Sequence, residues 1–98
     1  MFEFSEEYKR HIKSPRWKAT CQRAYATYGK RCMGCGSFRN LHVHHATYDR
    51  FGRELIADLR VVCQVCHRGI HALHRTNRKV SLLLVTNRYL KAKKANKV

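Results

Sequence analysis

Four of the five cysteines form two Cys-x-x-Cys pairs, Cys32 with Cys35 and Cys63 with Cys66. Two intervening residues let both sulfurs of a pair face one ion, and four thiolates suit tetrahedral zinc. A redox dithiol is the alternative, but it would need a single pair opening a helix in a larger domain. A chain of 98 residues buries only a marginal core. We therefore expect all four cysteines to hold a structural Zn²⁺, which would add folding free energy.

Histidines are concentrated in the same stretch of chain, at His42, His44, His45, His67 and His71. His67 and His71 are four residues apart on an expected helix, which places both imidazoles on one face. Consecutive strand residues point in opposite directions, so one of His44 and His45 can bind a metal ion while the other does different work. Three histidines leave coordination positions open, as in catalytic metal sites. His45, outside the metal shell, could then be a general base, because an imidazole titrates near neutrality.

Two short strands and a helix must bring these side chains together. Leu41–His44 alternates in polarity and predicts a strand, and 59–62 predicts a second one. The loop between them spans 46–57, and Cys66–His74 predicts the helix. The cysteine pairs would fix both the strand that carries His44 and the helix that carries His67, so the two histidine groups should lie close in space.

The flanking segments are expected to be helical. Ser14-Pro15 predicts a helix start and Gly29 its end. Trp17 and Cys21 fall on one helical stripe and are expected in the core, with Cys21 outside any metal site. An apolar pattern predicts a last helix over 83–90, followed by a basic tail expected to fray. We expect one domain, with a helical N-terminal segment (1–29), a core (30–75) and a basic C-terminal helix and tail (76–98).

The charge balance is strongly basic. Lysine and arginine total 21 against 6 acids, a net charge of +15, so the expected partner is a polyanion. The longest apolar run, Leu82–Val85, is too short for a membrane span, and no apolar secretion-signal region follows the N-terminus. The residues expected to neutralise phosphates near the site are Arg50, Arg53, Arg68, Arg75, Arg78 and Lys79.

Residues 32–71 contain these motifs in a characteristic order. They are Cys32-x2-Cys35, Leu41-His42-Val43-His44-His45-Ala46-Thr47-Tyr48, Gly52-Arg53-Glu54, Asp58-Leu59 and Cys63-x2-Cys66-His67-x3-His71. This order resembles the HNH endonuclease family, and is most similar to its small cysteine-bearing members, which are common in bacteriophages and mobile elements.

The resemblance implies an α+β fold with a zinc-stabilised ββα-metal (His-Me finger) core and flanking N- and C-terminal helices. It implies hydrolysis of DNA phosphodiesters, with His45 activating water. It implies that His44, His67 and His71 hold a catalytic divalent ion, which could be Mg²⁺, Mn²⁺, Ni²⁺ or Zn²⁺. Asp58 stands where the family name has asparagine. An aspartate there can accept a hydrogen bond that orients the base, or could touch the metal, and both roles stay open.

Partner, product and location follow as expectations. The partner is DNA, with no membrane and no small-molecule substrate. A single histidine set predicts a monomer that nicks one strand, although a dimer on DNA stays open. The expected location is the cytoplasm of a bacterial or phage-infected host cell. The alternative is a non-catalytic zinc-ribbon DNA-binding protein, which explains the cysteines and the charge but not the further histidines. His42 is expected to be a plain strand residue, and Tyr48, Gly52 and Glu54 are expected to serve packing and turns.

Overall fold

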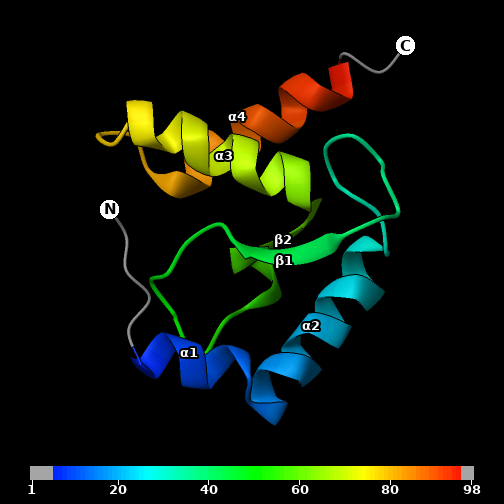
Figure 1. Cartoon of the computed structure of the whole chain (residues 1–98), viewed down its shortest axis with the longest axis vertical. Coiled ribbons are helices and arrows are strands. Elements are labelled where there is room, and N and C mark those ends of the chain that lie inside the picture. The colour runs from blue at the N-terminus through cyan, green and yellow to red at the C-terminus, as the bar shows by residue number, and fades with distance from the viewer. Residues whose placement is uncertain (1–5, 96–98) are drawn as a thin grey trace.

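An antiparallel hairpin lies at the centre of the fold, between two pairs of helices (Figure 1). The computed structural model describes residues 6–95. Strand β1 (Leu41–His45) pairs with β2 (Leu59–Cys63), with Leu41 opposite Cys63 and His45 opposite Leu59. The remaining elements are α1 (Glu6–Ile12), α2 (Pro15–Tyr28), the short 3-10 helix η1 (Ile56–Asp58), α3 (Gln64–Thr76) and α4 (Leu82–Ala95). The predicted α+β fold, a hairpin followed by a helix with flanking helices, is confirmed.

The ends of α2 follow directly from the sequence. The Ser14 hydroxyl accepts a hydrogen bond from the Trp17 backbone N–H at 3.1 Å, and Pro15 occupies the first helical position. At the other end Gly29 adopts a φ of +88°, which a side chain would disfavour, and its N–H donates to the Tyr25 carbonyl. The helix therefore runs between the two signals that predicted it.

Helix α3 begins at Gln64, two residues before the predicted start at Cys66. Cys63 is its N-cap, and the Cys63 Sγ accepts a hydrogen bond from the Cys66 N–H at 3.4 Å. A cysteine at this position is not a usual capping residue. The sequence did not predict the first turn of α3, because its N-cap is Cys63, a residue that also belongs to the cysteine cluster.

Helix α4 extends to Ala95, through residues that were expected to fray. Leu90 is buried in the core, and Tyr89 packs against the same core cluster. A Cβ placed on Gly69 of α3 would lie 2.6 Å from the Tyr89 hydroxyl oxygen, so α3 and α4 approach closely there. Packing, rather than the basic sequence, holds this helix in place. Residues 96–98 of the predicted tail lie outside the described residues.

The hairpin is buried on both of its faces. Val61 and Val62 are consecutive on β2 and both are fully buried. Val61 belongs to the core cluster formed with Trp17 of α2, and Val62 to the cluster formed with Ile70 of α3. Side chains from either face of the hairpin therefore enter an enclosed environment. Among residues 6–95, none of the helices combines the length and apolar character needed to cross a membrane.

Candidate active site

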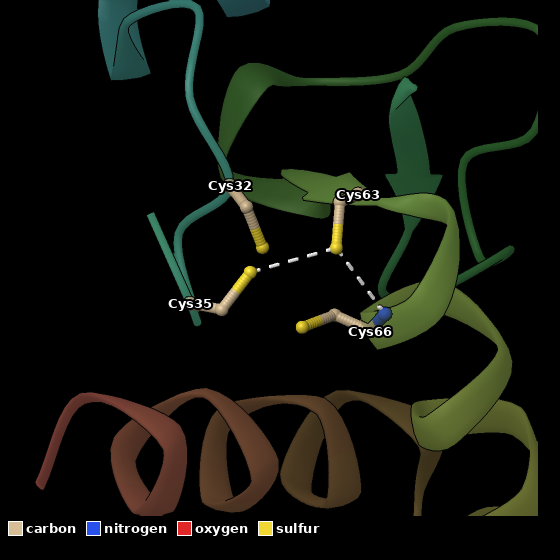
Figure 2. Close-up of side chains that lie close together, drawn as sticks. All are labelled: Cys32, Cys35, Cys63 and Cys66. Carbon is tan, nitrogen blue, oxygen red and sulfur yellow. Dashed lines mark hydrogen bonds between the residues drawn. The ribbon is translucent and has the colours of Figure 1, made fainter. Parts of the chain in front are cut away.

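Four cysteines converge at the end of the hairpin (Figure 2). Cys32 and Cys35 come from the loop after α2, Cys63 ends β2, and Cys66 lies in the first turn of α3. Their sulfurs all lie within 4.8 Å of one another, and the Cys35 and Cys63 sulfurs are 3.6 Å apart. The spacing of the two pairs predicted this convergence.

The donor set of the cysteine cluster fits zinc. Backbone N–H groups of Gly34 and Cys66 point at the sulfurs of Cys32 and Cys63, each at 3.4 Å. Burial raises the pKa of Cys32, but hydrogen bonds from its neighbours outweigh burial and lower that pKa to about 6. Burial also raises the pKa of Cys66, to about 12. Cys66 would therefore ionise only beside a cation, and the cluster is consistent with a structural zinc ion.

Three histidines form a second cluster on the α3 side of the hairpin. His44 of β1 and the pair His67 and His71 of α3 offer ring nitrogens within 4.8 Å of one another. The Nε2 atoms of His67 and His71 are 3.2 Å apart. The ring centroid of His44 lies 4.9 Å from that of His67 and 5.1 Å from that of His71. The structure thus brings together the three residues predicted as ligands of a catalytic ion.

His44 carries a nitrogen with no partner among the described residues. The residue is only 1% exposed, and its Nδ1 is buried without a hydrogen bond. Its Nε2 lies 3.0 Å from the Thr86 hydroxyl of α4. Buried polar atoms rarely stay unpaired, and a metal ion would satisfy Nδ1 while Thr86 accepts the Nε2 proton. The surroundings of His44 therefore fit a metal ligand.

The protonation state of the cluster also suits metal binding. Burial lowers the pKa of His44 to about 2, and the neighbouring imidazoles of His67 and His71 act in the same direction. Burial lowers the pKa of His67 to about 4, with His71 adding to the effect. Both imidazoles are therefore neutral at pH 7, which is the form that binds a metal ion.

His45 points to the opposite face of the hairpin, against α2. Its ring stacks on Trp17 at 4.6 Å between centroids and on Tyr48 at 5.1 Å. Its Nε2 lies 2.7 Å from Oε2 of Glu54. Burial lowers the pKa of His45 more than its contact with Glu54 raises it, so the ring is neutral at pH 7.

Glu54 receives two imidazoles on a single carboxylate oxygen. His11 of α1 places its Nε2 2.8 Å from Oε2, the atom that also contacts His45. Burial raises the pKa of Glu54, but hydrogen bonds from His45, the backbone and His11 outweigh it and hold that pKa below its usual value. Glu54 is therefore ionised. An ionised carboxylate only accepts hydrogen bonds, so both Nε2 atoms carry their protons.

Asp58 pairs with an arginine instead of a histidine. Its carboxylate receives two hydrogen bonds from the Arg50 guanidinium, one of them from Nε at 2.9 Å, and one from the Leu55 N–H at 3.0 Å. The structure therefore places Asp58 in neither histidine group, and the partner of His45 is Glu54. Arg50 was expected to contact DNA, but its guanidinium is paired with the Asp58 carboxylate. This charged pair stabilises the loop that carries Glu54.

The sequence predicted no role at the site for four residues that contact it: His11, His42, Glu54 and Thr86. His42 was expected to be a plain strand residue and Glu54 to serve packing and turns, but they contact His67 and His45. The Nδ1 of His42 lies 3.0 Å from the Nδ1 of His67, so His42 adjoins the metal cluster. Its alternation with His44 on one strand was a usable signal, because strand residues two apart share a face. His11 and Thr86 carry no such signal, since each is over 40 positions from its partner.

Arginines surround a shallow hollow of about 360 Å³ beside Glu54. Arg53 was expected near the site, whereas Arg16 and Arg23 of α2 were not. The Arg16 guanidinium donates to the Gly52 carbonyl at 3.2 Å, which ties α2 to the loop between the strands. The other basic residues predicted to meet phosphates are exposed on or after α3: Arg68, Arg75, Arg78 and Lys79.

Comparison with known proteins agrees with this geometry. Residues 32–73 match the family model described as HNH endonuclease. No curated protein and no solved structure matches the chain. The matched residues span the cysteine cluster, the hairpin and the helix that carries His67 and His71. Residues 32–73 of this chain are therefore similar to an HNH endonuclease domain, and they contain the four-cysteine cluster.

Proposed function

We propose that the protein is a metal-dependent endonuclease that hydrolyses phosphodiester bonds of DNA. The observation that carries this proposal is the cluster of His44, His67 and His71, in which a buried nitrogen of His44 lacks a partner among the described residues. The family match supports the same activity, because HNH domains act on DNA.

His44, His67 and His71 would hold one divalent ion. Imidazole ligands favour transition metals such as Mn²⁺, Ni²⁺ or Zn²⁺, and Mg²⁺ is the further candidate. When bound, the ion would stabilise the negative charge that develops on the phosphate and on the leaving 3′ oxygen. Three protein ligands leave open positions, as this role requires.

His45 is the proposed general base. The Nε2 atom of His45 donates its proton in a hydrogen bond to Glu54. The other ring nitrogen, Nδ1, therefore has a free lone pair and would accept the proton from the attacking water. Water then attacks the phosphorus opposite the leaving oxygen. The Glu54 carboxylate stabilises the imidazolium that forms, because the two groups carry opposite charge at hydrogen-bond distance.

Basic residues on both sides of the hairpin would hold the DNA. Arg16, Arg23 and Arg53 line one hollow, and the exposed residues of α3 and the segment after it provide a second group. The net charge of +15 favours binding of a polyanion. One histidine set can meet only one of two antiparallel strands in a single pose, so we propose a monomer that nicks.

One observation favours a second candidate, a non-catalytic DNA-binding protein. The His45 side chain is only 2% exposed and is stacked between two aromatic rings, as a purely structural histidine could be. Such a protein would bind DNA through the same arginines and would use the cysteine cluster for folding alone.

Incubation of supercoiled plasmid with zinc-loaded protein separates the two candidates. We expect open circles to appear before linear DNA when Mg²⁺, Mn²⁺ or Ni²⁺ is added, and no cleavage when a chelator is present. The melting curve in chelator must be unchanged during the assay, so that loss of the structural ion is not mistaken for loss of catalysis. Retarded DNA on a gel without cleavage in any of the metals would establish the binding protein instead.

A further inference from the structure

Helix α1 lies outside the residues that match the HNH family, yet it contacts the surroundings of His45. Tyr8 of α1 stacks on Phe51 of the loop between the strands, with ring centroids 5.4 Å apart. His11 meets the same Phe51 edge-on at 4.7 Å and lies 5.4 Å from Trp17. Figure 1 shows α1 beside this loop. The N-terminal helix thus packs against the segment that carries Glu54.

The shared oxygen of Glu54 gives this packing a chemical consequence. The Nε2 atoms of His11 and His45 lie 2.8 Å and 2.7 Å from Oε2 of Glu54. All three side chains are enclosed: His11 is 10% exposed, His45 is 2% exposed and Glu54 is 1% exposed. Both donors must be N–H groups, because the acceptor is a carboxylate. Backbone N–H groups near Glu54 also donate to this carboxylate, but His11 is the donor that ties it to α1. Loss of His11 would therefore remove one restraint from the oxygen atom that holds His45.

We propose that His11 is a positioning residue of the active site, which holds the Glu54 carboxylate so that Glu54 in turn keeps the His45 ring in its base-competent orientation. This inference rests on the proposed endonuclease function. His11 acts through Glu54 and does not itself touch DNA or the metal cluster. The hydrogen bond, and not the aromatic packing of His11 on Phe51 and Trp17, carries the effect.

Two substitutions separate hydrogen bonding from packing. His11→Phe keeps a ring that can pack on Phe51 and Trp17 but removes the donor. His11→Gln removes the ring but keeps an N–H that can reach Glu54. The two hypotheses therefore predict opposite orders of activity for this pair of variants.

The nicking rate at saturating metal gives the first measurement. We expect His11→Phe to lower kcat by about 10-fold to 100-fold, the loss that follows from one hydrogen bond to a charged group. KM for DNA should stay unchanged, and His11→Gln should recover most of the lost rate. In a protein that already carries Glu54→Gln, His11→Phe should not lower kcat further, because His11 acts only through Glu54. Equal losses in both variants, a loss confined to His11→Gln, or no loss in either would overturn the proposal.

A second measurement does not depend on cleavage. In wild-type protein the ring N–H proton of His45 is enclosed and bonded to Glu54, so its exchange with water should be slow. His11→Phe should accelerate that exchange at least about tenfold, and His11→Gln should leave it slow. Unchanged exchange in a folded His11→Phe protein would overturn the positioning role. If wild-type protein fails to cleave DNA in any metal, the proposed function fails by itself, and this exchange measurement still decides whether His11 holds Glu54.

Discussion

His44 and His45 are consecutive, yet their rings contact different helices on opposite faces of the hairpin. His44 faces α3, where His67 and His71 lie, and His45 stacks on Trp17 of α2. The alternation of a strand produces this separation, because successive side chains leave the backbone in opposite directions. One dipeptide thus supplies the proposed metal ligand and the proposed base without placing both imidazoles on one ion.

Replacement of His45 should separate catalysis from metal binding. We expect His45→Ala to lower the nicking rate by about 10²-fold to 10⁴-fold, the usual contribution of a general base. Affinity for Mn²⁺, measured by calorimetric titration of zinc-loaded protein, should stay near the wild-type value. In contrast, His67→Ala or His71→Ala should lower both the nicking rate and the affinity for Mn²⁺. Wild-type cleavage by a folded His45→Ala protein would remove His45 from the mechanism.

Thr86 should tune the histidine cluster from α4. Its hydroxyl contacts Nε2 of His44 at 3.0 Å and is fully buried. Thr86→Val keeps the shape but loses the acceptor, and we expect metal affinity to fall by about 10-fold to 100-fold. Thr86→Ser keeps the hydroxyl and is the matched control. An affinity that is equal in the valine and serine variants would show that the hydroxyl does not support His44.

The cysteine cluster should control folding. An apparent zinc-binding free energy of about 10 kcal/mol is comparable to the whole stability of a small domain. Cys66→Ser should therefore give a protein without bound zinc and without a cooperative melting transition. Cys21→Ser is the control, because Cys21 lies outside the cluster and burial raises the pKa of its thiol to about 11, so it stays neutral. Both quantities can be checked by metal analysis and circular dichroism.

The Arg50–Asp58 pair should stabilise the loop that carries Glu54 and should do so only above acidic pH. Hydrogen bonds from Arg50 hold the pKa of Asp58 below its usual value, despite burial. A depressed carboxyl pKa stabilises the fold above the unfolded pKa of about 3.9, and this contribution is lost as pH falls through the folded pKa.

Asp58→Asn tests this pair. We expect the melting temperature at pH 7 to fall by about 5 °C. The difference from wild type should shrink as the pH is lowered below about 4, because the carboxyl is then protonated first in the unfolded chain and, at lower pH, in the folded protein too. A difference that is constant from pH 7 to pH 3 would show that the charge of Asp58 does not matter.

Salt dependence should identify the residues that meet DNA phosphates. Each lost phosphate contact should flatten the slope of log K against log salt by about 0.9 on duplex DNA. We expect this for Arg53→Gln and Arg23→Gln beside the hollow, and for Arg75→Gln and Lys79→Gln near the end of α3. Arg50→Gln is the contrasting variant. Because Arg50 is paired with Asp58, its replacement should leave the slope unchanged.

Local signals predicted much of the fold and part of the site. Ser14-Pro15 and Gly29 marked α2 because caps act within one turn, and the spacing of His67 and His71 marked a helix face. Glu54 reaches His45 through a loop whose course follows no periodicity, so its role could not be deduced. Thr86 and His44 lie 42 positions apart, and their contact depends on how α4 packs. Contacts between distant elements are set by the packed molecule and leave no pattern in the sequence.

Helix α4 contacts both the cysteine cluster and the histidine cluster. Thr86 touches His44, and one helical turn later Leu90 packs into the cluster that contains Cys32 and Cys66. The same helix therefore contributes a side chain to the surroundings of each cluster. If an ion at one cluster changes the affinity of the other cluster, the effect is reciprocal, so each ion changes the affinity for the other by the same factor.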